Sequence, residues 1–320
     1  MKKSEDKVTK IATRDAYGQA LVKLGGVNTD IVVLDADLSK STKTADFHKV
    51  YPERFFNMGI AEQNLIGFSA GLAAAGKIPF ASTFAIFAAG RAFEQIRNSV
   101  AYPRLNVKIA VTHAGISVGE DGASHQAIED LALMRAIPNM TVLVPADAIE
   151  TYQVIKAAAE YHGPVYIRMG RLAVPVLFED NKYSFTIGKA NVIREGKDVT
   201  IIANGLMVSE ALKAAEDLKE QGIESTVVNC ASLKPLDEET IINAAKLTGA
   251  VVTAEEHSII GGLGSAVSEV LSENSPVPLR RVGVQDTFGE SGNPEELLKK
   301  YGLTAQEIII AVKEVIKQKR

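Results

Sequence analysis

Short apolar runs alternate along the chain with longer stretches in which apolar residues recur every three or four positions. A run of about four apolar residues is typical of a strand covered on both faces, and the wider spacing is typical of a helix. In the first half of the chain this pattern predicts strands at 31–34, 55–58, 78–84, 107–111, 140–144 and 165–169. It predicts helices at 15–24, from 61 onward, and at 88–101, 126–136 and 148–161. We expect Thr13 to cap the first helix and Gly25 and Gly26 to end it.

The alternation stops between residues 172 and 189, where Pro175, a polar run at 179–182 and Gly188 predict a linker with some strand at its end. Beyond it, predicted strands at 199–203, 225–228, 250–253 and 279–282 alternate with predicted helices at 208–220, 238–245, 264–272 and 305–317. Strands that alternate with helices form mainly parallel sheets with helices on both faces. We therefore predict an α/β fold with two consecutive open, mainly parallel-sheet domains. The first spans residues 10–175, the linker 176–190 and the second 191–320.

Composition narrows the function classes. A chain of 320 residues suits two domains, and a net charge of −4 with mixed signs provides no basic face for nucleic acid. The sequence contains no apolar run long enough to cross a membrane, and residues 1–10 are too polar for a secretory signal, so we predict a cytoplasmic protein. The single cysteine, Cys230, lies in an apolar run and is predicted to be a buried structural thiol. The five histidines show no zinc-ligand spacing with it.

One carboxylate stands out in the segment 54–64. Glu62 falls in the first turn of an otherwise apolar helix, and small residues at 67, 69–71 and 73–74 would let another backbone come close to this helix. A carboxylate that is desolvated at such an interface holds its proton more tightly and suits acid–base chemistry near neutral pH. The alternative is that Glu62 only complements the helix dipole.

Two loops follow predicted strands at their carboxyl ends, where ligands bind in open α/β sheets. The first, 35–41, is polar. The second, 112–126, is rich in glycine and contains His113, His125, Glu120 and Asp121. Imidazoles and carboxylates at this edge bind ligands or move protons, although such groups can also be solvated at a surface.

Other residues at the same edge leave two interpretations open. Phe84 and Phe87 either pack in the core or form a floor for a flat heteroaromatic ligand. Arg168 and Arg171 suit a phosphorylated substrate, although an ion pair with an acidic residue would have the same sequence. In the second domain, the glycine-rich run 261–264 could bind a phosphate at a helix start, but it lacks the P-loop lysine, and we favour a tight turn.

Five segments together resemble the transketolases, in order and at the spacing of that family. They are Asp37 to Ser41, Gly59 to Glu62, Ser82 to Phe84, Thr112 to Gly122 and Ile167 to Arg171. The resemblance covers about residues 10–175, and the second domain looks like the C-terminal domain of the family. It implies a thiamine diphosphate enzyme whose first domain here binds the pyrimidine ring.

The resemblance also implies roles for individual residues. Glu62 matches the catalytic glutamate that hydrogen-bonds the aminopyrimidine ring, with Phe84 and Phe87 lining the pocket and Asp37 near the cofactor. His125, also taken as catalytic, and Asp121 would contact the carbonyl and hydroxyl groups of the donor sugar. The sugar phosphate would be held by Ser41, His113 and Arg171. Arg168 is the competing candidate for the role of Arg171.

A motif of full-length transketolases is missing. These enzymes hold the diphosphate through a metal such as Mg²⁺, bound by a Gly-Asp-Gly…Asn motif in a preceding domain, and nothing in this chain fits it. The resemblance therefore implies that this chain contributes no metal ligand and pairs with a separate N-terminal subunit that carries the diphosphate and metal site. Two copies of each subunit form the simplest closed assembly.

The implied activity is transfer of a two-carbon ketol unit between phosphorylated sugars in the pentose phosphate pathway. Variant sugars, such as apulose phosphate or a sulfosugar, are alternatives. So are the beta subunit of a 2-oxo acid dehydrogenase, which would not need phosphate-binding residues, and a non-catalytic scaffold subunit. A 1-deoxyxylulose-phosphate synthase is less favoured because that family usually keeps all three domains in one chain.

Overall fold

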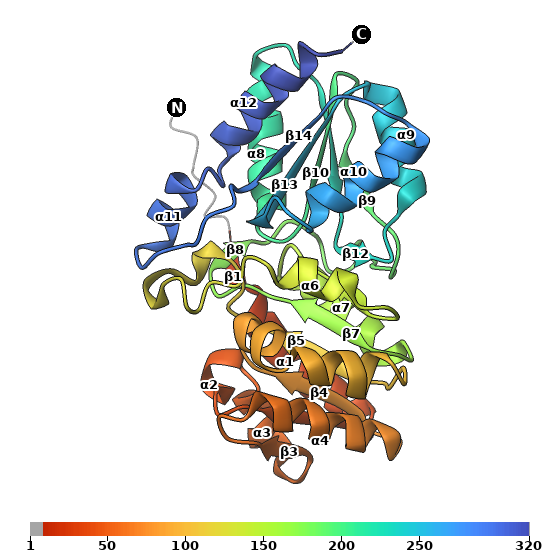
Figure 1. Ribbon diagram of the computed structural model, residues 1–320, viewed down its shortest axis with the longest axis vertical. Coiled ribbons are helices and arrows are strands. Elements are labelled where there is room, and N and C mark those ends of the chain that lie inside the picture. Colours follow the sequence, from red (N-terminus) through yellow and green to blue (C-terminus); the bar gives the residue numbers. More distant parts are fainter. Residues whose placement is uncertain (1–8, 320) are drawn as a thin grey trace.

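Two sheets organise residues 9–319, which are the residues that this computed structural model describes (Figure 1). The polar stretch 1–8 and Arg320, which the sequence analysis includes, lie outside them. We call the part built on the seven-stranded sheet the first unit and the part built on the five-stranded sheet the second unit. The second unit is stacked above the first in Figure 1.

The sheet of the first unit has the order β12-β6-β7-β5-β4-β2-β3. Its strands are β2 (Ile31–Asp35), β3 (Phe55–Asn57), β4 (Ile78–Ser82), β5 (Lys108–Val111), β6 (Thr141–Leu143), β7 (Val165–Arg168) and β12 (Ser232–Lys234). All neighbours pair in parallel except β12 and β6. Every strand predicted for the first half is present, with ends that shift by one or two residues.

Helices cover both faces of this sheet. They are α1 (Thr13–Val27), α2 (Ser39–Thr42), α3 (Ala45–Val50), α4 (Glu62–Ala74), α5 (Phe93–Gln95), α6 (Asp130–Ala136) and α7 (Ala148–Glu160). Short 3-10 helices occur at η1 (Pro52–Arg54) and η4 (Ile116–Asp121). The single helix predicted at 88–101 is instead α5 between two π-helical segments, η2 (Phe87–Arg91) and η3 (Ile96–Ala101).

The predicted end of the first helix at Gly25 was wrong. Helix α1 continues to Val27. The predicted cap at Thr13 was wrong as well, because the N-cap is Ala12 and the Thr13 hydroxyl accepts a 2.9 Å hydrogen bond from the backbone N–H of Gly170. Gly25 serves close packing instead, because a Cβ at this position would lie 2.6 Å from Cε2 of Phe47 on α3.

The second unit has the sheet order β14-β13-β10-β11-β9. Its strands are β9 (Asn191–Arg194), β10 (Val199–Ala203), β11 (Ser225–Asn229), β13 (Val251–Ser258) and β14 (Leu279–Val284), and only β9 runs antiparallel. Its helices are α8 (Met207–Glu220), α9 (Glu238–Thr248), α10 (Leu263–Asn274), α11 (Pro294–Lys300) and α12 (Ala305–Ile316). The predicted α/β fold class is therefore confirmed, and α11 is an addition to it.

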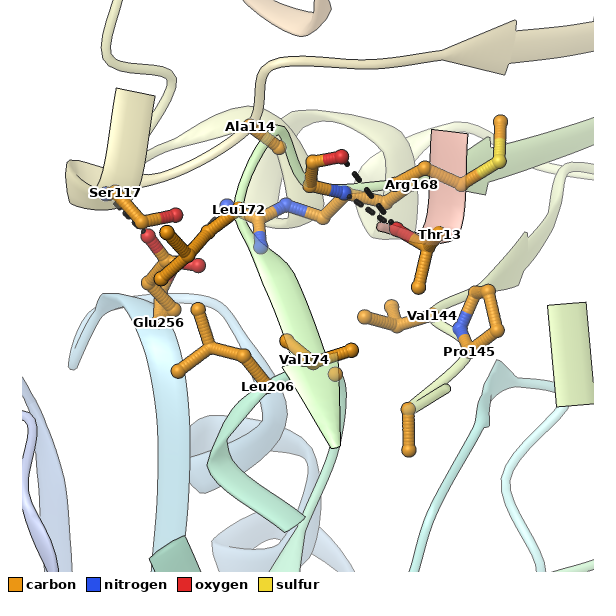
Figure 2. A pocket seen from close by; sticks show the side chains of 14 residues that line it. Thr13, Ala114, Ser117, Val144, Pro145, Arg168, Leu172, Val174, Leu206 and Glu256 are labelled. Carbon is orange, nitrogen blue, oxygen red and sulfur yellow. Dashed lines mark hydrogen bonds between the residues drawn. The ribbon is translucent and has the colours of Figure 1, made fainter. Parts of the chain in front are cut away.

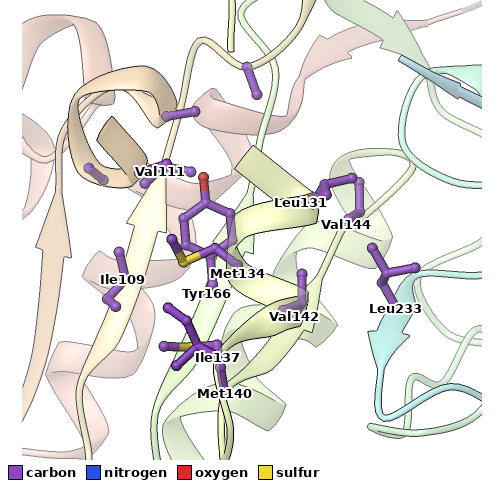
Figure 3. Close-up of a cluster of buried hydrophobic side chains, with 14 of the residues drawn as sticks. Ile109, Val111, Leu131, Met134, Ile137, Met140, Val142, Val144, Tyr166 and Leu233 are labelled. Atoms are coloured by element: carbon purple, nitrogen blue, oxygen red, sulfur yellow. The ribbon is translucent and has the colours of Figure 1, made fainter. Parts of the chain in front are cut away.

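The two units share strands and core. Strand β8 (Ala173–Pro175), at the start of the predicted linker, pairs with β1 (Lys10–Ala12). Strand β12 belongs to the second half of the sequence yet completes the sheet of the first unit. Its Leu233 is buried in one cluster with Val142, Val144 and Leu131, as Figure 3 shows. Among the described residues, no helix is both long enough and apolar enough to cross a membrane.

Candidate active site

Glu62 is the first residue of α4, and its side chain is 5% exposed. Its Oε1 accepts a hydrogen bond of 2.7 Å from Nη1 of Arg91, whose own side chain is 51% exposed. Among the described residues, this is the one ion pair that the carboxylate makes. The guanidinium of Arg91 lies 4.0 Å from the ring centroid of Phe87. A buried carboxylate thus lies beside an aromatic surface, with a partly exposed cation between them.

Aromatic rings continue from Phe87 into the site. Phe87 stacks on Phe84 with centroids 5.7 Å apart, and Phe84 stacks on the imidazole of His113 at 3.8 Å. The imidazole of His125 approaches Phe87 edge-on at 5.2 Å. Phe84 is buried and Phe87 is half-buried, so the two rings pack in the core and also line the site.

His113 joins this aromatic row to a cation that the sequence analysis missed. Nη1 of Arg14 donates to Nε2 of His113 at 3.1 Å and to the carbonyl oxygen of Ser41 at 3.1 Å. Since arginine only donates, Nε2 accepts, and the proton of the neutral imidazole lies on Nδ1, 2.8 Å from Oγ1 of Thr112. Burial and the charges of Arg14 and Arg171 lower the pKa of His113 to about 3, which keeps the ring neutral near pH 7.

Arg14 has one further unusual property. Its Nε is buried and, within the described residues, has no hydrogen-bond partner. Burial lowers the pKa of Arg14, and the nearby charge of Arg171 lowers it further. A donor without an acceptor, beside a second guanidinium, is the arrangement that an anion completes. The sequence did contain a signal that Arg14 could have a binding role. A cation in the first turn of a helix is unfavourable because it opposes the helix dipole, so its presence there calls for an explanation.

The two arginines near the end of β7 have different surroundings. Arg168 is 5% exposed; its Nε donates to the Asp130 carboxylate, and its Nη2 donates to the carbonyl oxygens of Ala127 and Glu256. Arg171 is half-buried and pairs with Glu120 at 2.9 Å, with a further bond to the carbonyl of Val118. Arg168 is thus committed to a buried ion pair, whereas Arg171 lies near Arg14 and His113.

The loop after β2 is held by a buried aspartate that the sequence analysis did not single out. The Asp35 carboxylate accepts hydrogen bonds from the backbone of Leu38 and from the hydroxyls of Thr42 and Thr44. Burial raises the pKa of Asp35. Asp37 is exposed and has a left-handed backbone with φ of 64°, and its Oδ1 accepts a 3.0 Å bond from Asn57.

Asp121 and His125 lie on the loop after β5. Asp121 is the exposed last residue of η4. His125 is half-buried, and its Nδ1 lies 2.9 Å from Oγ of Ser124. The aromatic contacts of His125 bring it to the same row of rings as His113.

The glycine-rich run of the second unit is a tight turn whose amides are already used. Glu255 is buried, and its carboxylate accepts bonds of 2.7 and 2.8 Å from the backbone amides of Leu263 and Gly264 at the start of α10. A carboxylate of the chain itself therefore takes the place that a phosphate would need.

Comparison with known proteins identifies the family. The model of the transketolase pyrimidine-binding domain matches residues 9–176, and the model of the transketolase C-terminal domain matches residues 188–308. The chain belongs to the transketolase family. It is 55% identical to the "Putative transketolase C-terminal section" of Methanocaldococcus jannaschii, covering 95% of this chain and 96% of that protein.

Two further relatives have informative descriptions. A "6-deoxy-6-sulfo-D-fructose transketolase subunit" of a Clostridium species is 48% identical, covering 96% of this chain and 95% of that protein. A solved structure described as "Split gene transketolase, inactive beta4 tetramer" is 64% identical with a TM-score of 0.91, covering 97% of this chain and all of that one. The resemblance deduced from the five segments is therefore confirmed.

Membership of the transketolase family implies dependence on thiamine diphosphate. The residues of the first unit fit the pyrimidine half of that cofactor, because a buried carboxylate lies beside a flat aromatic surface. Between residues 9 and 319, no three or more His, Cys, Asp or Glu residues come together in a way that could hold a metal ion.

Proposed function

We propose that this chain is the pyrimidine-binding subunit of a transketolase that transfers a two-carbon ketol unit from a ketose phosphate to an aldose phosphate. The observation that carries the proposal is one continuous row of contacts. It runs from the Glu62 carboxylate through Arg91, Phe87 and Phe84 to His113 and Arg14. An acid–base group, a flat binding surface and an anion-binding site thus lie one after another in space along one edge of the sheet.

The residues divide between cofactor and sugar. Thiamine diphosphate would supply the carbanion chemistry. Glu62 would hydrogen-bond its aminopyrimidine ring, with Arg91 moving away from the carboxylate, and Phe84 and Phe87 would pack against that ring and exclude water. Asp37 would lie near the cofactor.

The sugar would lie at the other end of the row. His125 and Asp121 would contact the carbonyl and hydroxyl groups of the donor. The phosphate would be bound by Arg14, Arg171, Ser41 and His113. To donate to it from Nε2, the neutral imidazole of His113 would have to release its bond from Arg14 and move its proton from Nδ1 to Nε2. Arg168 is not included, because its guanidinium is committed to Asp130 and to backbone carbonyls.

A separate N-terminal subunit would supply the diphosphate and Mg²⁺ site. One side of α4, formed by Gly67, Phe68 and Gly71, supports a subunit contact. Neither glycine has a described atom within 4 Å of an added Cβ, and Phe68 is 43% exposed. The relative described as an inactive beta4 tetramer is consistent with a chain that self-associates and needs a partner for activity. We propose two copies of each subunit in the cytoplasm.

The sugar itself is the less constrained part of the proposal. The cationic cluster of Arg14 and Arg171 favours a phosphorylated sugar over the 2-oxo acid of a dehydrogenase beta subunit. A relative described as acting on sulfofructose makes a variant sugar the second candidate, because a sulfonate would occupy the same cluster.

The test is a ketol-transfer assay on the chain reconstituted with an N-terminal transketolase subunit that carries the Gly-Asp-Gly…Asn motif. With xylulose 5-phosphate and ribose 5-phosphate, Glu62→Gln should lower turnover by about ten- to a hundredfold, the value of a hydrogen bond to a charged group. Assembly should stay intact. Glu53→Gln, at an exposed position, is the matched control. Full turnover by Glu62→Gln, or by this chain without a partner, would contradict the proposal.

A further inference from the structure

The loop after β5 lies between the two units. We call residues 115–122 the substrate loop, because it carries Asp121 and also Glu120, the ion-pair partner of Arg171. The side chains of Glu120 and Asp121 are exposed, yet the loop from Gly115 to Gly119 is buried. The residues that bury it come largely from the second unit.

Glu256, near the carboxyl end of β13, makes the first of these contacts. Its Oε1 accepts a 2.6 Å hydrogen bond from the backbone N–H of Ser117, and its side chain is 5% exposed, as Figure 2 shows from close by. Gly115, with φ of 81°, passes so close that a Cβ would lie 2.3 Å from Cδ of Glu256. The carboxyl group therefore rests directly on the backbone of the substrate loop.

Arg168 fixes the backbone of Glu256. Nη2 of Arg168 donates to the carbonyl oxygen of Glu256 at 2.9 Å, while Nε is paired with the buried Asp130. The carbonyl and the carboxyl of Glu256 are thus both bound by the first unit. This gives Arg168 a structural role that links the two units.

A second group of contacts comes from the segment that leads into α11. Nε2 of Gln126 donates to the carbonyl oxygens of Glu290 and Ile116, at 2.9 and 3.2 Å. Oγ of Ser291 donates to the carbonyl oxygen of Glu120. Helix α11 packs against η4 itself. The substrate loop is therefore held from two sides.

The carboxyl edge of the second sheet is filled by this arrangement. Ligands usually bind at that edge in open α/β sheets. Here the cavity bordered by Glu256, Ser117, Arg168 and Gly205 has a volume of about 20 Å³, enough for one water molecule (Figure 2). The edge that could bind a ligand holds the substrate loop instead.

We propose that the second unit serves the sugar site by fixing the substrate loop, with Glu256 as a positioning residue for Asp121 and for the Glu120–Arg171 pair. The inference rests on the function proposed above. Among residues 9–319, no hydrogen bond or ion pair joins Glu256 to the aromatic row or to Glu62, so its influence on the sugar site should leave the pyrimidine site unchanged.

The experiment compares Glu256→Ala and Glu256→Gln in the reconstituted complex, with Glu273→Ala on an exposed face of α10 as the control. Glu256→Ala should raise the KM for the sugar phosphate by about tenfold or more, because small displacements of binding groups are costly. The Kd for thiamine diphosphate should stay within about twofold. Glu256→Gln should restore the KM, because its amide oxygen can still accept from Ser117.

Hydrogen exchange gives a readout that does not depend on activity. Amides in residues 115–122 should exchange faster in Glu256→Ala than in the parent chain, and the amides of α4 should not. If the parent complex shows no ketol transfer, the proposed function fails, while exchange still tests whether Glu256 holds the loop. Unchanged KM and exchange in an assembled Glu256→Ala complex would overturn the inference. Equal losses in sugar binding, cofactor binding and thermal stability would overturn it as well.

Ser291→Ala covers the case in which Glu256→Ala does not fold. Ser291 is solvent-accessible, and within the described part of the chain its hydroxyl bonds only to the substrate loop, so its loss should leave the fold intact. The KM for the sugar phosphate should rise and exchange in residues 115–122 should increase, both less than for Glu256→Ala. If the KM for the sugar phosphate and the exchange in residues 115–122 are the same in Ser291→Ala as in the parent, the proposal is contradicted.

Discussion

The guanidinium of Arg14 is the residue-scale feature with the sharpest consequence. It bridges Ser41 and His113, and its Nε has no described acceptor. We predict that Arg14→Ala raises the KM for the sugar phosphate by about ten- to a hundredfold, because charge-assisted hydrogen bonds to the phosphate are lost. The Kd for thiamine diphosphate should change little.

Steady-state kinetics of the reconstituted complex would measure this, with Arg280→Ala at the distant β14 edge as the control. Arg14→Lys separates charge from geometry, since lysine keeps the charge but not the planar group of donors. If Arg14→Ala binds the sugar phosphate as the parent does, the anion site lies elsewhere.

Most candidate residues could be predicted at this scale, but not their environments. Glu62, Phe84, Phe87, His113 and His125 stood out because they follow strands at one edge of a sheet, and the structure does bring them into one row. Arg14 was missed because it precedes the first strand of that sheet, and only the packing of α1 against the sheet brings it to His113. No local pattern could show that Arg168 is enclosed by residues of both units. The catalytic and binding roles remain proposals.

At the scale of elements, long periodic segments were predicted well and short ones were not. The buried strands and amphipathic helices repeat over enough residues to be distinctive. Strand β12 has three residues and gains its partner β6 only when the two units meet, so sequence could not show it. Helix α11 had local signals that could have been used, namely the Asn293 cap and Pro294 in the first turn.

Helix α4 carries a prediction about assembly. Gly71 lies in its interior with no described atom near an added Cβ, so Gly71→Leu should fold and gain helix propensity. If this side of α4 forms a subunit contact, the added side chain will clash, and the dissociation constant of the assembly should rise by about tenfold or more.

Analytical ultracentrifugation would measure the assembly, and circular dichroism would confirm folding. Glu220→Leu, at the exposed end of α8, adds a similar side chain elsewhere and is the control. Unchanged association of Gly71→Leu would exclude this side of α4 as the contact.

At the scale of the whole molecule, the stability of the fold depends on buried polar residues where the two units meet. Glu150 on α7 is fully buried and accepts hydrogen bonds from Tyr183, from Asn229 of the second unit and from the backbone of Ala146. Burial raises the pKa of Glu150 to about 7. The folded chain therefore binds this proton more tightly than the unfolded chain does, and its stability falls as the pH rises from the unfolded pKa toward 7.

We predict that Glu150→Gln removes this dependence. The melting temperature of the variant minus that of the parent should increase between pH 5 and pH 8, since only the parent then carries a buried charge. Differential scanning calorimetry at several pH values would measure it. Glu160→Gln, exposed at the end of the same helix, controls for the change in net charge. A difference that does not vary with pH would contradict the prediction.

Strand β12 also limits how the gene could be divided. A cut at the polar stretch near residue 180 would follow the visible break in the sequence, yet the first fragment would lose the last strand of its own sheet. The backbone of β6 would then be an open edge that can pair with a second molecule, and open edges promote aggregation. We therefore expect the two halves of this chain to fold well only as one polypeptide.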